Sequence, residues 1–216
     1  MKKIHFITFI IIALISMRAG AQTNKTDFMI KYDFISLLGD QVTNSMGIQL
    51  GAEIPLNSSQ SVAMDAMYIF PCQSCDQPYT SIYTEKTSGW MLSAEYRHYI
   101  IPGKQSLSGF HLGPQILFQH TKSEMRETYG GGIENHYQVY RDLLAAHVMA
   151  GYQLRITGPL YFNPALGLGA RFISSRNENK KGTDSGQHEY PYDKDFESGS
   201  KWFPGIHINI KLGLKL

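Results

Sequence analysis

The side chains with the clearest capacity for chemistry in this sequence are acids and bases that occupy alternate positions within apolar segments. Asp65, for example, lies between Met64 and Ala66. Successive side chains of a β-strand point to opposite faces, so these charges are expected on one face and the apolar residues on the other. The charges assigned to this common, inward face are Lys31, Asp33, Glu53, Asp65, Glu95, Arg97, Arg155, Arg171 and Lys211.

The two cysteines of the chain, Cys72 and Cys75, form a C-x-x-C motif in a polar segment. Two cysteines in an exported protein more often pair than remain free, so a disulfide that stiffens this segment is expected. A redox role stays an alternative, although the motif lacks the strand-to-helix setting of redox enzymes. Zinc would need two further ligands, and the spacing indicates none. No metal or cofactor is therefore predicted.

The histidines raise the question of hydrolytic chemistry. Alternation places His98 on the apolar face of a segment, but no serine and acid accompany it at a matching spacing. His111, His147 and His207 fall on the polar face, where hydrogen-bonded interior residues are more common than ligands. No catalytic residue is predicted. A lipid-modifying enzyme would need an outward cluster of histidine, serine and acid near the exterior rim.

The segments that carry these residues alternate between apolar and polar positions, which predicts β-strands with two different faces. The clearest is IHINIKLGLKL at 206–216, where Ile or Leu stands at every second position. A closed antiparallel barrel in a bacterial outer membrane needs an even number of strands. The eight alternating segments are 28–33, 45–56, 61–70, 90–100, 110–119, 146–155, 160–172 and 206–216.

The links between these segments alternate in length, as expected for tight turns at one rim and long loops at the other. Short links lie near 57–60, 102–106 and 157–159, and long polar links span 71–88, 121–141 and 174–201. The link near 39–44 is on the loop side but short. Tyrosine among Asn, Ser and Gly in the long links is typical of a contact surface or of an aromatic girdle, and both interpretations stay open.

A soluble barrel or sandwich would also have alternating strands. Here, however, the polar face mixes glycine and alanine with charges of both signs, which suits a narrow, crowded interior. We therefore predict an all-β, eight-stranded antiparallel up-and-down transmembrane β-barrel with short periplasmic turns and long exterior loops. A barrel of this size is only wide enough for side chains to fill, which favours a packed polar lumen over an ion or proton path past Glu95 and Arg97.

The first twenty-one residues have the features of a cleaved signal peptide: Lys2 and Lys3, an apolar run over 6–15, and Ala19-Gly20-Ala21 as cleavage site. The predicted domains are the signal peptide, 1–21, and the barrel, 22–216. Removal of the peptide lowers the count of basic residues from 20 to 17 against 18 acidic ones, so the formal charge changes from +2 to −1. No nucleic-acid partner is indicated.

Three stretches carry a family resemblance: GWMLSAEYRHYIIPGKQSLSGFHLGPQILF at 89–118, AGYQLRITGPLYFNPALGLGARF at 150–172, and the run at 206–216. The E-Y-R-x-Y of 95–99, followed by S-G-F-x-x-G-P at 108–114, is the most specific part. The chain resembles the small eight-stranded outer-membrane barrels of Bacteroidota, which are catalogued as a domain of unknown function. The resemblance implies the fold and the outer membrane, and it supplies no catalytic residues.

A protein of this kind would contact outer-membrane lipid and would depend on the barrel-assembly machinery for insertion. We expect it to be monomeric or weakly associated. The functional expectation is a structural or surface-binding role, in which the exterior loops are presented to a surface ligand or to another envelope protein. A lipid-modifying enzyme and a narrow pore are the alternatives.

Overall fold

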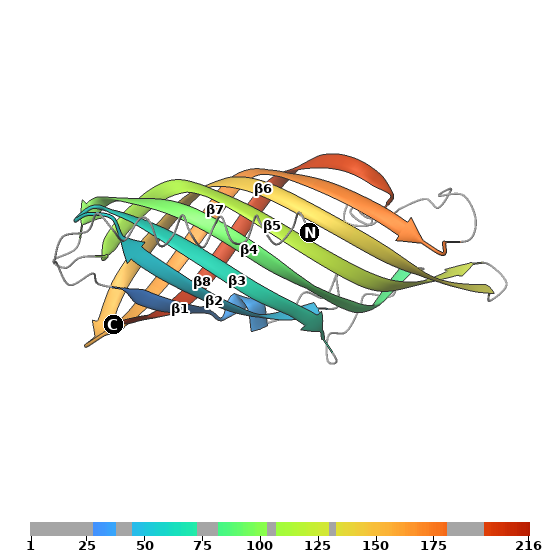
Figure 1. The fold of residues 1–216 in the computed structure, drawn as a ribbon, viewed down its shortest axis with the longest axis horizontal. Coiled ribbons are helices and arrows are strands. Elements are labelled where there is room, and N and C mark those ends of the chain that lie inside the picture. Colours follow the sequence, from blue (N-terminus) through green and yellow to red (C-terminus); the bar gives the residue numbers. More distant parts are fainter. Residues whose placement is uncertain (1–27, 38–44, 73–81, 103–106, 130–132, 181–196) are drawn as a thin grey trace, which may run out of the picture.

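The computed structural model describes residues 28–37, 45–72, 82–102, 107–129, 133–180 and 197–216, and every structural statement below refers to these. Eight antiparallel strands form one closed ring, in which each strand pairs with the next and β1 pairs with β8 (Figure 1). The prediction of an all-β, eight-stranded up-and-down barrel is confirmed. The strands are β1 (Met29–Asp33), β2 (Ser45–Pro55), β3 (Gln60–Pro71), β4 (Ile82–Pro102), β5 (Gly109–Tyr129), β6 (Ile133–Thr157), β7 (Leu160–Glu178) and β8 (Gly199–Lys215).

The predicted signal peptide lies outside the described residues, and so does Cys75. Within the described part of the chain, no helix is long and apolar enough to cross a membrane. The described helical structure is a single 3-10 turn, η2 (Ile35–Leu37), directly after β1.

The ring closes where the short strand β1 pairs with β8. The register runs from Met29 opposite Lys215 to Asp33 opposite Lys211, and the Phe34 amide extends it by donating to the Ile210 carbonyl oxygen at 3.0 Å. This pairing removes both free edges of the sheet, which would otherwise expose unpaired backbone groups. The alternation in the last segment therefore marks the two faces of the strand that completes the ring.

The predicted loop over 121–141 is wrong for most of its length. Strand β5 continues to Tyr129 and β6 begins at Ile133, with residues paired one to one between them. Strand β4 likewise begins at Ile82 rather than near residue 90. Polar residues occupy both faces here, so the hydrophobic alternation that reveals a strand is missing although the backbone pairing continues. In Figure 1 this β5–β6 hairpin reaches farthest to the right.

We call the right-hand end in Figure 1, where this hairpin lies, the loop end. The opposite end, which carries the links at 57–59 and 158–159, is the turn end. Buried apolar side chains fill the interior at three levels. Met29, Tyr99, Leu107 and Tyr161 cluster near the turn end, Met91, Leu117, Leu143, Ala145 and Ile173 cluster farther along, and Met125, Tyr137 and Val139 cluster inside the hairpin.

Candidate functional site

Arg97 on β4 is the centre of a buried charge network. This network lies between the apolar cluster near the turn end and the middle apolar cluster. Its Nη1 donates to Glu53 Oε2 at 3.1 Å, to Asn163 Oδ1 at 3.1 Å and to Gln153 Oε1 at 3.4 Å. Its Nη2 donates to Glu95 Oε2 at 2.7 Å. The planar fork of the guanidinium suits such multiple contacts. One side chain thus connects strands β2, β4, β6 and β7 across the interior.

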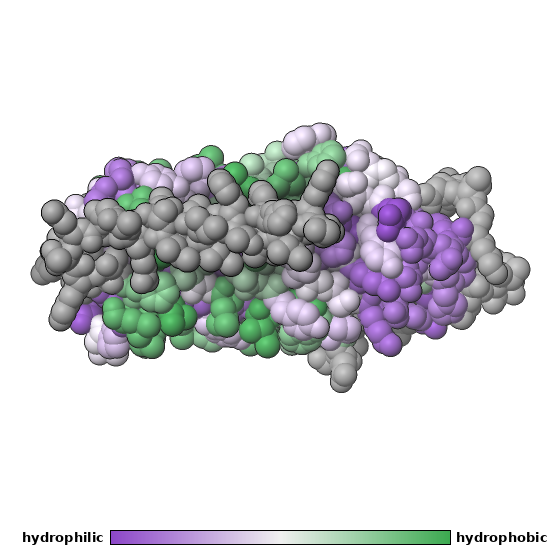
Figure 2. Space-filling view, in the orientation of Figure 1, coloured by the Kyte–Doolittle hydropathy of each residue, from purple (hydrophilic) through white to green (hydrophobic). Residues whose placement is uncertain are grey.

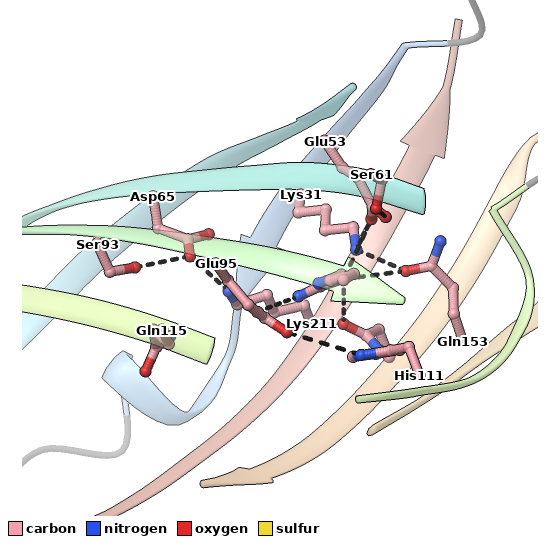
Figure 3. A network of polar contacts seen from close by, with 12 residues as sticks. Lys31, Glu53, Ser61, Asp65, Ser93, Glu95, His111, Gln115, Gln153 and Lys211 are labelled. Atoms are coloured by element: carbon pink, nitrogen blue, oxygen red, sulfur yellow. Dashed lines mark hydrogen bonds and ion pairs between the residues drawn. The ribbon is translucent and has the colours of Figure 1, made fainter. Parts of the chain in front are cut away.

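Glu53 on β2 has partners for both carboxylate oxygens. Ser61 donates to Oε1 at 2.5 Å and the Tyr99 hydroxyl at 2.7 Å, while Oε2 is paired with Lys31 and Arg97. Figure 3 shows Lys31 extending between Glu53 and Gln153, to which its Nζ donates at 2.5 Å. With Glu95 included, the group contains two acids, Glu53 and Glu95, and two bases, so its formal charges balance. Balance matters because a buried charge is costly unless it is paired and hydrogen bonded.

A second ion pair lies beside this group. Lys211 Nζ on β8 donates to Asp65 Oδ2 on β3 at 2.8 Å, and the Ser93 hydroxyl donates to the same oxygen at 3.0 Å. Gly51 on β2 makes room for the acid, because a Cβ at residue 51 would collide with the Asp65 carboxylate. Small residues among the inward charges thus allow large polar side chains to cross a narrow lumen.

The predicted inward charges do not all meet in one place. Lys31, Glu53, Glu95 and Arg97 form the central group, Asp65 and Lys211 form the adjacent pair, and Asp33 accepts a hydrogen bond from the Ile35 amide at 2.9 Å. Each of these seven side chains belongs to a residue no more than 5% exposed. Arg171 lies elsewhere in the interior, half-buried, with its Cζ 5.3 Å from the centre of the Phe203 ring.

The prediction that Arg155 belongs to the charge network in the lumen is wrong. This residue is exposed at the β6–β7 turn, where its Nε donates to the Gly158 carbonyl oxygen at 2.5 Å. Arg155 is still in register with the buried Tyr161, and the shift between β6 and β7 comes after it. Arg155 is exposed because it lies at the rim of the barrel, beside the turn, and a period-two pattern does not show where the rim lies.

Neutral polar residues complete the network. The prediction that His111 is a hydrogen-bonded interior residue is confirmed, whereas Gln153 and Asn163 were not among the predicted site residues. Gln153 and Asn163 accept from Arg97, Gln153 Nε2 donates to the Leu107 carbonyl oxygen, and Asn163 Nδ2 lies 3.1 Å from His111 Nε2. Alternation assigns Gln153, Asn163 and His111 to the polar face. Their role depends on meeting Arg97 from strands far away in the sequence, which a local pattern cannot show.

A further polar level lies beyond Asp65 towards the loop end. His147 Nδ1 lies 3.2 Å from Gln115 Oε1, and the His147 ring stacks on His207 at 5.5 Å between centroids. Within the described chain, both amide atoms of the fully buried Asn209 and the Nε2 atoms of Gln49, Gln115 and His207 have no hydrogen-bond partner. Buried polar atoms of this kind are ordinarily satisfied by ordered water.

No group of three or more His, Cys, Asp or Glu side chains in the described residues is placed to hold a metal ion. Cys72 follows the end of β3 and is buried. Because Cys75 lies outside the described residues, the pairing of the two cysteines stays a prediction.

The outer surface of the ring carries a continuous belt of exposed apolar side chains. On β6 the belt extends from Ile156 to Leu144, twelve positions apart. With a rise of roughly 3.3 Å per residue and a tilt of about 40°, that distance corresponds to a height of about 30 Å. Figure 2 shows hydrophobic surface over the left and centre of the barrel and hydrophilic surface at the loop end.

Aromatic rings border this belt. Towards the loop end, Trp90 lies 5.3 Å from Phe118 and Phe172 lies 5.1 Å from Trp202, measured between ring centroids. Tyr96 and Tyr152 are exposed on the same wall nearer the turn end. Barrels of the outer membrane have an apolar band of roughly 25 Å with aromatic residues near both of its edges.

A histidine and an acid form a pair on the outer wall, immediately beyond the loop-end girdle. His120 on β5 and Asp142 on β6 are direct cross-strand partners, and Nδ1 lies 2.6 Å from Oδ1. Both side chains are accessible, at 37% and 56%. The sequence analysis missed this pair because it ended the strand at Gln119 and assigned 121–141 to a loop.

No protein-family model matches the sequence, and neither does any curated protein. Among solved structures, the fold is similar to a major outer membrane protein from Thermus thermophilus. That match has a TM-score of 0.46 and 11% sequence identity, and it covers 89% of this chain and 100% of the other.

Two chemically distinct surfaces thus result from the fold. The interior contains paired charges and apolar clusters that link strands across the lumen. The outer wall places an accessible imidazole and carboxylate, His120 and Asp142, at the border of the apolar belt.

Proposed function

We propose that the protein spans the outer membrane of a bacterial cell, with its apolar belt in the bilayer and its turn end in the periplasm. A closed ring leaves no unpaired strand edge in lipid, and the belt has the height that the hydrocarbon core requires. The predicted signal peptide would export the chain to the barrel-assembly machinery. The motifs at 89–118 and 150–172 support a place among the small barrels of Bacteroidota.

Within that membrane, we infer a structural or surface-binding role rather than a transport role. The interior contains the network around Arg97 and the clusters around Tyr99 and Leu143, and its charges are paired rather than free to conduct. An eight-stranded barrel is filled by such side chains. The lumen therefore acts as a core that stabilises the scaffold.

The observation that carries the surface-binding role is the hairpin that extends beyond the girdle. From His120 and Asp142 onwards, β5 and β6 stay paired up to Tyr129 and Ile133. Met125, Tyr137 and Val139 form an apolar cluster inside this extension. Backbone pairing and an internal cluster make it a rigid platform rather than a loose loop, which lowers the entropy lost on binding.

The outer face of the extension is charged. Glu85 Oε1 on β4 lies 3.6 Å from Arg126 Nε and 3.9 Å from His136 Nδ1. Side chains of both signs on and beside a rigid hairpin suit a polar surface ligand or a neighbouring envelope protein. We propose such a partner, held through these charges.

Shortening the hairpin tests this role. Ser123 and Val139 are direct partners, so replacing 124–138 with Asn-Gly joins them by a two-residue turn. We expect the shortened barrel to reach the outer membrane at the wild-type level. The purified variant should no longer bind to an array of bacterial and host glycans. On intact cells, the variant should no longer cross-link to neighbouring envelope proteins. As a matched control, Asn-Gly in place of 57–59 at the turn end should leave both unchanged. Equal binding by both variants would contradict the proposal.

The pair of His120 and Asp142 favours a second candidate, hydrolysis of a lipid ester. Asp142 would hold the imidazole through Nδ1, so that Nε2 takes a proton from a water molecule attacking the ester carbonyl. The same proton would then pass to the departing alkoxide, releasing a fatty acid and an alcohol. Fatty acid released from vesicle lipid by the wild type, and not by His120→Gln, would support this candidate. Equal release by both would remove it.

A further inference from the structure

Two cations and one aromatic ring lie side by side on the outer wall, one row beyond His120 and Asp142 towards the loop end. In the register of the sheet, Lys122 on β5 is opposite Tyr140 on β6, which is opposite Arg176 on β7. Lys122 Nζ is 5.5 Å from the centre of the Tyr140 ring, and Arg176 Cζ is 5.2 Å from it. One tyrosine therefore holds two positive groups, because the face of an aromatic ring attracts cations.

The height of these cations relative to the apolar belt is defined by the strands. Lys122 follows Phe118 by four positions on β5, and Arg176 follows Phe172 by four positions on β7. Four residues along a tilted strand correspond to about 10 Å of height. The headgroup layer occupies roughly 5–8 Å on each side of the hydrocarbon core. With the girdle at the edge of that core, the Cα atoms of the two residues lie just beyond the headgroup layer. The long side chains of lysine and arginine can reach back into it.

The neighbouring acids leave these cations able to accept a new partner. Arg176 Nη2 is 3.0 Å from Glu178 Oε1, but both side chains are exposed, and an exposed pair of this kind contributes little. Asp142 is engaged by His120, and Glu124 lies one row farther from the membrane. The Tyr140 hydroxyl donates to Gln138 Oε1 at 3.1 Å, which orients the ring between the two cations.

We propose that Lys122, Tyr140 and Arg176 bind the phosphate headgroup of an anionic lipid in the outer leaflet. The guanidinium can grip phosphate oxygens in a bidentate manner, while the lysine adds a second charge. The acyl chains would continue down the wall over Phe118, Leu144 and Phe172, which form the next apolar row. This inference rests on the proposed placement of the barrel in a membrane.

The two tryptophans of the chain report on this wall. Trp90 borders Phe118, and Trp202 borders Phe172. The purified barrel is refolded into phosphatidylcholine vesicles that contain a small fraction of brominated lipid, either phosphatidylglycerol or phosphatidylcholine. Because bromine quenches nearby tryptophan, preferential binding of the anionic lipid should give stronger quenching by brominated phosphatidylglycerol at equal bulk content.

Removing the cations should remove the preference. We expect the wild type to concentrate phosphatidylglycerol around this wall, and each of Lys122→Gln and Arg176→Gln to reduce the preference roughly fivefold, the usual effect of one basic residue near an anionic surface. Lys86→Gln is the matched control, because Lys86 is an exposed cation on β4 that does not contact Tyr140 in the described contacts. An equal loss in the control, or no loss in either variant, would overturn the site.

The experiment also distinguishes a wrong headgroup site from a wrong placement of the barrel in the membrane. A barrel that does not insert into phosphatidylcholine vesicles stays fully sensitive to protease and shows no compact form on unheated gels, whichever variant is used. A barrel that inserts but shows no preference for phosphatidylglycerol keeps its membrane placement and contradicts the headgroup site alone.

Discussion

Arg97 and Glu53 lie 3.1 Å apart in the middle of the barrel, although 44 positions separate them in the sequence. Neither side chain is accessible to solvent. Arg97 also contacts Glu95 on its own strand, so it neutralises one of two acids that would otherwise be buried with a single base, Lys31. The stability of the filled lumen therefore depends on this guanidinium more than on any single surface charge.

Replacing Arg97 should destabilise the barrel strongly. Arg97→Met leaves Glu53 and Glu95 with one base between them, and loss of one partner of a buried pair typically costs about 3–5 kcal/mol. Urea unfolding of the barrel in lipid vesicles, followed by tryptophan fluorescence, measures the free energy of unfolding. Arg155→Met is the control, since Arg155 is exposed at a turn, and it should change the free energy by less than about 0.5 kcal/mol. Equal unfolding midpoints for the two variants would disprove the central role of Arg97.

A charge on the outer wall should cost more in the middle of the belt than at its edge. Val148 and Ile156 both face outwards on β6, at 66% and 55% exposure, and Ile156 lies at the turn end. We expect Val148→Arg to weaken folding into vesicles by about 2–4 kcal/mol and Ile156→Arg by about 0–1 kcal/mol, measured as the free energy of folding. A similar cost at both positions would show that the belt does not face lipid.

Ion current should appear only when the interior is emptied. The wild type is expected to carry no measurable current across a planar bilayer. Leu117 on β5 and Leu143 on β6 both belong to the middle apolar cluster. Replacing both with alanine removes two large side chains from the interior and should allow small, brief openings. Current through the wild type, with a conductance that scales with salt, would favour the pore.

The two cysteines should be unreactive until reduced. An even pair in an exported chain is expected to be oxidised, so iodoacetamide should leave the unfolded protein unmodified and should add two carbamidomethyl groups after reduction. Intact mass spectrometry measures both states. Modification of the unfolded, unreduced chain would show that Cys72 and Cys75 carry free thiols.

The part of the fold that follows from local geometry could be predicted from sequence. A period of two assigns each residue of a regular strand to one face, and this correctly placed Lys31, Glu53 and Arg97 inside and Val148 outside. It failed where a strand ends or loses its apolar face. Arg155 is exposed because it lies at the end of β6, beside the turn, and polar residues on both faces of 121–141 conceal a strand pair.

By itself, the sequence determined the strand count, the two faces and the closed ring, because alternation depends only on the backbone of each strand. Only the tertiary structure decided which side chains meet. The contact between Arg97 and Asn163 spans 66 positions, and the pairing of His120 with Asp142 requires the extended register of β5 and β6. Such side-chain contacts depend on the tilt of the strands and on the register between neighbours around the ring. These are properties of all eight strands together, and no single segment of the sequence contains them.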